Sequence, residues 1–259
     1  MRLSERDVAI LESLLDYRLL QTSYVRRLHF AHGHATVNAA TGATMRVLTR
    51  LESHGLVMRL ERRIGGVRSG SSGIVWQLGA TGERLLRTMH GQKKRRRYVE
   101  PSPAFTAHTL AVAELAVTLH ELRDRGAVEL ISVETEPSCW RSFAGPQGTL
   151  EWLKPDLFVI TASGDYEDHW LFEADLATEH PPVVVRKAKV YQRYAATGAH
   201  QNRHGLFPAV VWVVPDTARQ AAVQAALSAD TALQPELFRV ITTEDFAALI
   251  TGDQPDPPG

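Results

Sequence analysis

Acidic side chains in the second half of the chain have the types and spacing of a cation site. Glu173 and Asp175 are two residues apart in a segment typical of a β-strand, so their carboxylates point to one face of a sheet. Asp156 lies on the preceding predicted strand and Glu114 on an earlier predicted helix, and both could face the same place. Clustered carboxylates repel one another and are costly to bury, so such a cluster indicates a bound cation. Oxygen ligands favour Mg²⁺ or Mn²⁺, and all four carboxylates are candidate metal ligands.

The elements that must position these carboxylates form an α/β domain over residues 105–252. Helix and strand patterns alternate in the order α-β-β-β-α-β with additions, which is typical of a sheet covered by helices. The two middle strands form a predicted hairpin that brings Asp156 beside Glu173. Residues 137–152 are predicted to be a loop, and residues 253–259 a frayed tail. Helices are expected at 105–125, 183–197, 217–228 and 244–250, and strands at 128–136, 153–162, 169–178, 207–216 and 237–241.

Residues 1–90 predict a winged helix-turn-helix domain. Ser4 and Asp7 form a capping-box pattern at the start of a first helix, and Thr22 can cap a second. A third helix is expected at about 41–54, ended by Gly55. Strands at 56–63 and 74–78 then flank a loop rich in glycine and serine, and a fourth helix begins at Thr81. The fold class is therefore α+β in this domain and α/β in the second.

The charge of the chain differs sharply between its two parts, although the whole has no net charge. Residues 1–100 hold 18 Lys and Arg against 8 Asp and Glu, a net charge of +10, and residues 101–259 have a net charge of −10. A basic region suits a polyanion such as DNA. Residues 91–104, which contain five consecutive cations and two prolines, are predicted to be a linker.

Double-stranded DNA is therefore the expected partner of the basic region. In a helix-turn-helix the second helix of the motif enters the major groove, where arginine can read guanine. Arginines of the hairpin tip and cations of the linker would contact phosphates or a minor groove. An exposed arginine stripe is also typical of a solvated face or of a protein-interaction module, and that alternative stays open. The candidate DNA-binding residues are Arg46, Thr49 and Arg50 on the third helix, Arg62, Arg63 and Arg68 in the hairpin, and Lys93, Lys94, Arg95, Arg96 and Arg97 in the linker.

The acidic pattern resembles that of the PD-(D/E)xK nuclease superfamily. Pro-Asp at Asp156, then a Glu-x-Lys-like segment at Glu173, inside an α-β-β-β-α-β core, matches the order of motifs in those enzymes. The resemblance implies that the Asp and Glu bind metal and that a lysine supports the attacking water. Asp175 occupies the lysine position here, so Lys187 or Lys189 on the following helix would have to supply that group. The departure favours a degenerate, catalytically silent fold over an active Mg²⁺- or Mn²⁺-dependent nuclease.

The order of motifs along nearly the whole chain more specifically resembles the replication-relaxation family of mobile-element proteins. The matching segments include RVLTRLESHGLVMRL, WQLGATGERLL, KPDLFV, FEADLATEH and KAKVYQRY. The resemblance implies a winged helix coupled to a nuclease-like domain, acting in plasmid replication, conjugative transfer or their transcriptional control. Replication or transfer proteins are then expected partners, and a homodimer is an open alternative. A nuclease targeted by the winged helix and a structural adaptor are the other two hypotheses.

Other features of the sequence favour a soluble cytoplasmic protein without a membrane partner. Cys139 is the single cysteine, and the longest strongly apolar run, at 209–214, is far shorter than the roughly 18 residues of a membrane helix. His29, His32 and His34 have ligand-like spacing, but no cysteine or acidic neighbour completes a site, which favours a loop or a helix end. A second histidine pair, His200 and His204, flanks a predicted loop and is expected to have ordinary surface roles.

Overall fold

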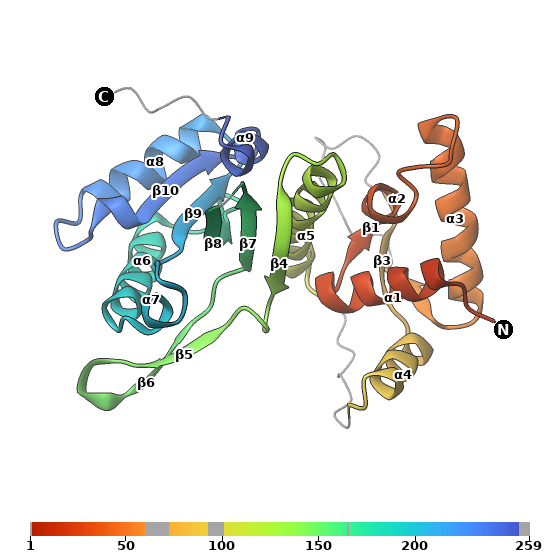
Figure 1. Ribbon diagram of the computed structural model, residues 1–259, viewed down its shortest axis with the longest axis horizontal. Helices are drawn as coiled ribbons and strands as arrows, with labels where there is room; N and C mark the ends of the chain where they lie inside the picture. The colour runs from red at the N-terminus through yellow and green to blue at the C-terminus, as the bar shows by residue number, and fades with distance from the viewer. Residues whose placement is uncertain (1, 61–72, 93–100, 165, 254–259) are drawn as a thin grey trace. The chain divides into compact units, whose positions relative to one another are not determined.

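The computed structural model describes residues 2–60, 73–92, 101–164 and 166–253 (Figure 1). The chain forms two compact units, residues 1–117 and 118–259. The division falls inside the helix α5 (Pro103–Asp124), so the first part of this helix belongs to the first unit. The domain boundary predicted from the sequence instead puts the whole of this helix in the second domain. No helix in the described part of the chain is long and apolar enough to cross a membrane.

The first unit combines helices with a small antiparallel sheet. Its strands lie in the order β1-β3-β2, with Leu20 opposite Trp76 and Val57 opposite Leu78. The two-residue strand β1 is too short to leave a sequence pattern and was not predicted. The elements are α1 (Glu5–Tyr17), β1 (Leu20–Gln21), α2 (Thr22–His29), α3 (Val37–Ser53), β2 (Val57–Arg59), β3 (Val75–Leu78) and α4 (Ala80–Met89).

Local sequence signals explain where these helices begin and end. In α1 the Ser4 hydroxyl accepts from the Asp7 backbone N–H, and the Asp7 carboxylate accepts from the Ser4 N–H at 2.9 Å, as the capping box predicts. The helix α3 begins at Val37, four residues earlier than expected, because the Thr36 hydroxyl caps it. Gly55 follows the end of α3 with a φ of +67°, a backbone conformation that favours glycine.

Two interactions hold the small sheet of the first unit against its helices. The indole of Trp76 is fully buried and donates a hydrogen bond of 2.9 Å to the Thr22 hydroxyl at the start of α2. The helix α4 approaches the chain before β2 so closely that a Cβ atom at Gly82 would lie 2.2 Å from the Leu56 carbonyl oxygen. Only glycine permits this contact, so Gly82 sets how closely α4 packs.

The second unit is built on a mixed five-stranded sheet in the order β10-β9-β8-β7-β4. The pairs β4–β7 and β7–β8 are antiparallel, whereas β8–β9 and β9–β10 are parallel and are connected by helices. The region expected to be a loop contains a separate hairpin, β5–β6. The strands are β4 (Glu129–Thr135), β5 (Arg141–Ala144), β6 (Leu150–Leu153), β7 (Leu157–Ser163), β8 (Tyr166–Ala174), β9 (Ala209–Val214) and β10 (Phe238–Thr242). The helices are α6 (Pro181–Ala196), α7 (Ala199–His204), α8 (Thr217–Ser228) and α9 (Phe246–Thr251), with 3₁₀ turns at Pro146–Gly148 and Pro235–Leu237.

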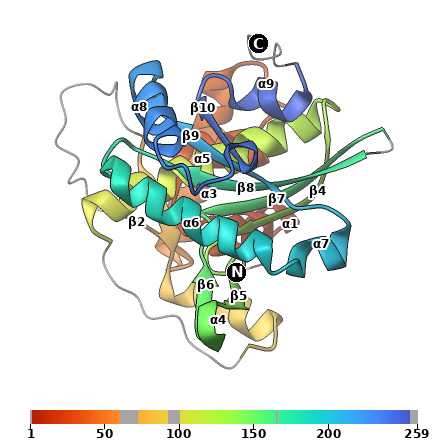
Figure 2. The same cartoon turned by 90° about the vertical axis from the view of Figure 1, so that its left-hand side faces the viewer.

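Helices cover both faces of this sheet. The helices α6 and α8 pack on one face through a core that includes Leu171, Tyr191, Trp212 and Val223, and Figure 2 shows α6 running across the strands. The short helix α9 lies on the other face, where the Phe246 ring packs edge-on against Phe172 at 5.2 Å. The alternation along β8 therefore sends its odd-numbered residues from 171 onward toward α6 and α8. Glu173 is one of these residues.

Candidate functional site

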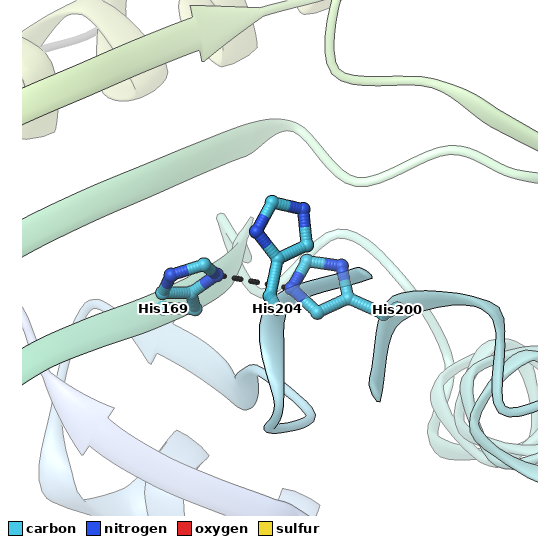
Figure 3. Close-up of side chains that lie close together, drawn as sticks. All are labelled: His169, His200 and His204. Atoms are coloured by element: carbon cyan, nitrogen blue, oxygen red, sulfur yellow. Dashed lines mark hydrogen bonds between the residues drawn. The ribbon is translucent and has the colours of Figure 1, made fainter. Parts of the chain in front are cut away.

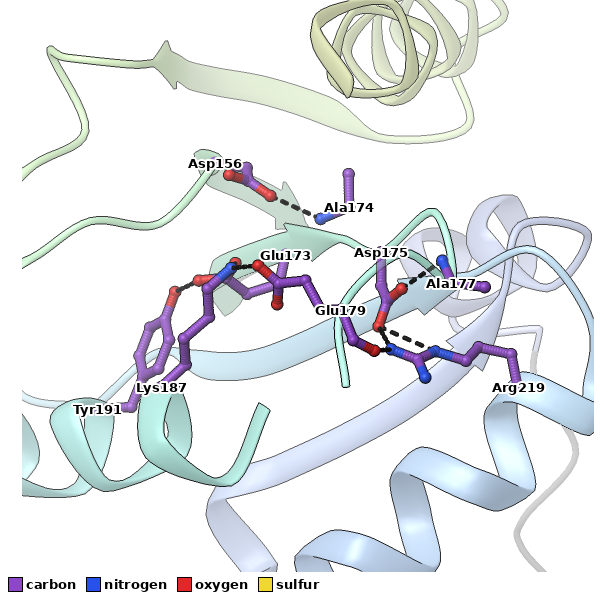
Figure 4. A network of polar contacts seen from close by, with 9 residues as sticks. All are labelled: Asp156, Glu173, Ala174, Asp175, Ala177, Glu179, Lys187, Tyr191 and Arg219. Atoms are coloured by element: carbon purple, nitrogen blue, oxygen red, sulfur yellow. Dashed lines mark hydrogen bonds and ion pairs between the residues drawn. The ribbon is translucent and has the colours of Figure 1, made fainter. Parts of the chain in front are cut away.

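The hairpin of β7 and β8 brings Asp156 beside Glu173, as the sequence analysis expected. The Asp156 backbone N–H donates to the Phe172 carbonyl at 3.1 Å, and one oxygen of its carboxylate accepts from the Ala174 N–H at 2.8 Å. Both acidic residues are almost completely buried, with exposed fractions of 5% for Asp156 and 2% for Glu173. These contacts place the two carboxylates at the end of neighbouring strands, in the network drawn in Figure 4.

Two side chains of α6 reach the Glu173 carboxylate. The Lys187 ammonium lies 3.1 Å from Oε2 of Glu173, and the Tyr191 hydroxyl donates to Oε1 (Figure 4). Residues 187 and 191 are four apart, so they project from the same side of the helix. Lys187 also lies 3.2 Å from the Glu179 carboxylate, in the segment before α6. The ammonium thus lies between a buried and a half-exposed carboxylate.

Burial and charge perturb the titration of this group of residues. Burial, with the nearby charge of Asp156 adding to it, raises the pKa of Glu173 to about 8, although Lys187 and Tyr191 act in the opposite direction. Burial alone would lower the pKa of Lys187, but the negative charges of Glu173, Asp156 and Glu179 outweigh it and raise that pKa. The site therefore carries a lysine ammonium and still has an excess of acidic groups. A divalent cation would offset that excess.

The donor set of the site fits such a cation in part. Asp156 and Glu173 supply carboxylate oxygens, the ligands that Mg²⁺ and Mn²⁺ prefer. Both oxygens of Glu173 already accept hydrogen bonds, so a metal ion would have to share one of them with Lys187 or Tyr191. Asp156 and Glu173 are the residues that could hold the ion.

Asp175 occupies a different environment from the other two carboxylates. It is buried, and one of its oxygens accepts two hydrogen bonds from the Arg219 guanidinium at 2.6 and 3.1 Å. The other oxygen accepts from the Ala177 N–H, and Arg219 also donates to the Glu179 carbonyl at 2.7 Å. This ion pair connects the chain after β8 to α8. Asp175 is therefore engaged as a structural anchor, and Arg219, from a segment 44 residues away, could not be identified as its partner from sequence spacing.

Two of the expected site residues have other partners in the structure. The Lys189 ammonium lies 2.7 Å from the Asp230 carboxylate, so Lys187 is the lysine of this helix that contacts Glu173. Glu114 belongs to the first unit and forms an ion pair with Arg27 on α2. A helix pattern identifies the buried side of α5 but not the unit against which that side packs, which is why Glu114 was grouped with the acidic cluster.

The arginine stripe of α3 divides into two kinds of residue. Arg46, Thr49 and Arg50 are all exposed. The guanidinium of Arg50 in addition pairs with the Asp7 carboxylate, whose side chain is only 2% exposed. The sequence groups Arg50 with Arg46 as a DNA-binding candidate. It does not reveal the contact with Asp7, because spacing carries no information on a partner 43 residues away. The hairpin arginines and the linker cations (Arg62, Arg63, Arg68, Lys93, Lys94, Arg95, Arg96 and Arg97) lie outside the described residues.

The described fold defines a mixed α+β protein with a buried network of acidic and basic side chains where β7 begins and β8 ends. The family described as replication-relaxation matches residues 11–210, and the chain belongs to this family. No curated protein matches it. Among solved structures, the restriction endonuclease FokI bound to DNA matches with a TM-score of 0.26 and 11% identity, over 93% of this chain and 43% of that one. The chain thus spans less than half the length of FokI, and a similarity this low carries no argument about fold or activity.

Proposed function

We propose that this chain is a sequence-specific DNA-binding protein of a plasmid or another mobile element, acting in replication, conjugative transfer or their transcriptional control. The exposed polar face of α3 is the observation that carries the proposal. The helix belongs to a unit with three helices, a β1-β3-β2 sheet and a closing helix, an order of elements that we assign to a winged helix-turn-helix. The family supports the setting in mobile-element replication or transfer.

In this proposal α3 is the helix that enters the major groove. It has 17 residues and is about 25 Å long, and the major groove, about 12 Å wide, admits such a helix. Arg46 has no ion-pair partner among the described residues, so its guanidinium is available for a bidentate contact with guanine. Thr49, one turn along, would contact a base or a phosphate. Arg50 contributes to the stability of the unit through Asp7 instead of to base reading.

The basic residues of the hairpin and of the linker complete the proposed DNA interface. Arg62, Arg63 and Arg68 would contact phosphates or the minor groove beside the site. The run from 93 to 97 would add affinity and salt dependence without sequence preference. Reading of two half-sites by a homodimer is compatible with this mode of binding.

Fluorescence anisotropy with duplexes from the region around the native gene tests the proposal. We expect saturable binding at low salt that Arg46→Ala weakens by about 1–3 kcal/mol, roughly 5- to 150-fold, for the preferred duplex. Arg125→Ala is the matched control, since Arg125 is an exposed arginine of the second unit and its side chain is 70% exposed. The proposal fails if the chain binds no duplex at low salt. It also fails if both variants bind DNA with the same affinity as the wild-type protein.

A metal-dependent nuclease is the second candidate, and the contact of Lys187 with Glu173 favours it. The Lys187 ammonium lies beside the acidic pair, although Asp175 occupies the position of the lysine in the Glu-x-Lys pattern. Asp156 and Glu173 would hold Mg²⁺ or Mn²⁺, which would activate water, and Lys187 would place positive charge beside the attacking group. The ion pair between Asp175 and Arg219 favours the alternative in which the second unit is a scaffold without catalytic activity.

Cleavage assays with either metal distinguish these two alternatives. If the unit is a nuclease, Asp156→Ala, Glu173→Ala and Lys187→Ala abolish cleavage, whereas Lys189→Ala, a lysine of the same helix paired with Asp230, retains it. Cleavage that persists in the first three variants comes from a contaminant and removes the candidate. A wild-type protein that cleaves no nucleic acid with Mg²⁺ or Mn²⁺ supports the silent fold.

A further inference from the structure

Three histidines converge in the second unit, away from the residues of the acidic network. His169 lies on β8, and His200 and His204 lie four residues apart on α7 (Figure 3). One ring nitrogen from each lies within 4.8 Å of the others. The sequence predicts surface roles for the pair on α7, but His200 is buried, with an exposed fraction of 6%, and so is His169, with 4%. The sheet contributes the third imidazole from more than 30 positions away, so no spacing rule could group the three.

We propose that His169, His200 and His204 form a binding site for a divalent transition-metal ion, with Zn²⁺ as the occupant. Neutral imidazole is a preferred ligand of Zn²⁺, and three protein ligands with an open fourth position are a common zinc arrangement. Two histidines at i and i+4 on a helix present their rings on one face, as in other helical zinc sites. This site is independent of the proposed DNA binding and of the acidic network.

The distances between the rings match the geometry of such a site. Nδ1 of His169 and Nε2 of His200 are 3.0 Å apart, and in this structure they share a hydrogen bond. Tetrahedral zinc with bonds of about 2.0–2.1 Å places neighbouring ligand atoms about 3.3 Å apart. The ring centroid of His204 lies 4.4 Å from that of His200 and 5.0 Å from that of His169. In the proposed site the three ring nitrogens, which lie within 4.8 Å of one another, would move to this separation around the ion.

An aromatic ring and charged side chains surround two of the imidazoles, those of His169 and His200. The Phe158 ring packs edge-on against both, at 6.0 and 5.9 Å. Arg141 and Arg203 place positive charge near His200, while Glu167 and Asp168 place negative charge near His169.

Two further features fit a metal site with access to solvent. Oε2 of Glu167 lies 3.6 Å from Nε2 of His169, the ring nitrogen that does not face His200. Metal-binding histidines typically direct this second nitrogen to a carboxylate, which fixes the ring and strengthens it as a ligand. His204 is exposed and so provides a route for the ion and a side on which water can complete the coordination. The structure thus supplies three imidazoles, a carboxylate near one of them and an exposed ring at His204.

A zinc titration of the full chain, produced without a polyhistidine tag and stripped with a chelator, tests the site. We expect one equivalent of Zn²⁺ to bind in competition with a metal-sensitive dye, and Co²⁺ to give the absorption bands of a low-coordinate nitrogen site. Glu167→Gln should weaken binding by about 10- to 100-fold, the usual effect of losing an orienting partner. His204→Ala should weaken it further, because this change removes a ligand.

Matched variants separate this site from other histidines of the chain. His204 is exposed, so His204→Ala should retain the fold, and circular dichroism would verify that it does. The control is the double variant His32→Ala/His34→Ala, which removes two exposed histidines with ligand-like spacing in the first unit and should bind zinc as the wild type does. The inference is overturned if the wild-type chain binds no equivalent of zinc, if His204→Ala binds it undiminished, or if the control loses it.

Discussion

Replacement of Arg50 by alanine separates a structural arginine of α3 from the arginine, Arg46, that we propose contacts DNA. The change removes the guanidinium that pairs with Asp7 and leaves the buried carboxylate without its cation. We expect Arg50→Ala to lower the free energy of unfolding and Arg46→Ala to leave it within about 0.5 kcal/mol, because exposed positions without specific contacts tolerate substitution. For DNA affinity measured on folded protein, we expect the larger loss in Arg46→Ala and the smaller loss in Arg50→Ala.

The magnitude for Arg50→Ala follows from the burial of its partner. Loss of one member of a fully buried ion pair costs about 3–5 kcal/mol, and exposed pairs contribute about 0–1 kcal/mol. Here the Asp7 side chain is 2% exposed but the Arg50 side chain is 41% exposed, so solvent screens the pair. The Asp7 carboxylate also keeps its hydrogen bond from the Ser4 N–H. We therefore expect a loss of about 1–3 kcal/mol, the range of hydrogen bonds to charged groups.

The pH dependence of the same pair has a definite sign. Burial acts to raise the pKa of Asp7, but hydrogen bonds from Ser4 and Arg50 outweigh it, and the pKa in the folded protein is lowered. The stability that the pair contributes is therefore fully present above the unfolded pKa, about 3.9, and is lost as the pH falls through the folded value. The difference between wild type and Arg50→Ala should be constant from about pH 5 to 8 and should shrink below about pH 4.

Urea unfolding followed by circular dichroism, combined with a double-mutant cycle, measures these effects. Asp7→Asn keeps the size of the side chain and removes its charge, so the double variant Asp7→Asn/Arg50→Ala isolates the energy of the pair. We expect a coupling energy of about 1 kcal/mol or more. The reasoning is refuted if Arg50→Ala has wild-type stability and no coupling to Asp7→Asn, while its folded form loses DNA affinity as strongly as Arg46→Ala does.

Three further outcomes follow from the structure. Gly82→Ala should lower stability by about 1–3 kcal/mol, because its Cβ would lie 2.2 Å from a backbone carbonyl. Gly42→Ala in α3 meets only an ordinary 3.6 Å contact and should raise stability by about 0.5–1 kcal/mol. Equal effects of the two changes in urea unfolding would contradict this contrast. Burial lowers the pKa of His120 to about 4. The stability of the wild type should therefore fall relative to that of His120→Gln as the pH drops from about 6.5 toward 4, by at most about 1.4 kcal/mol per pH unit. Parallel curves of stability against pH for the two proteins would contradict this expectation. Cys139 is buried and burial raises the pKa of its thiol, so a thiol reagent should modify it only at the rate of unfolding; immediate labelling of folded protein would show that the residue is accessible.

Much of the fold follows from local patterns in the sequence. The helix α8 begins and ends at the predicted residues, and the hairpin of β7 and β8 is present as expected. These elements have strong periodicity, and caps such as Asp216 at α8 mark their ends. The strand β1 and the hairpin β5–β6 were not predicted. They are short, and strands of two to four residues are specified mainly by the neighbours with which they pair.

The acidic site shows the same division between local and distant information. The approach of Asp156 to Glu173 is a property of one hairpin, so the sequence predicts it. The choice of Lys187 over Lys189 as the contact of Glu173 depends on which side of α6 faces the sheet. The pairing of Asp175 with an arginine of α8 depends on the packing of two helices on the sheet.

The amino-acid sequence by itself determined the order of elements, the acidic hairpin, the uneven distribution of charge and the resemblance to the replication-relaxation family. Each of these depends on residue type and on spacing within one or two neighbouring elements. Only the tertiary structure decided which charged side chains meet: Arg50 with Asp7, Arg219 with Asp175, and His169 with the two histidines of α7. These contacts join residues 31 to 44 positions apart, and periodicity carries no information on partners at that separation. The uneven charge therefore identifies the region that we propose to bind DNA, and the packing shows that one of its arginines, Arg50, forms an ion pair within the unit.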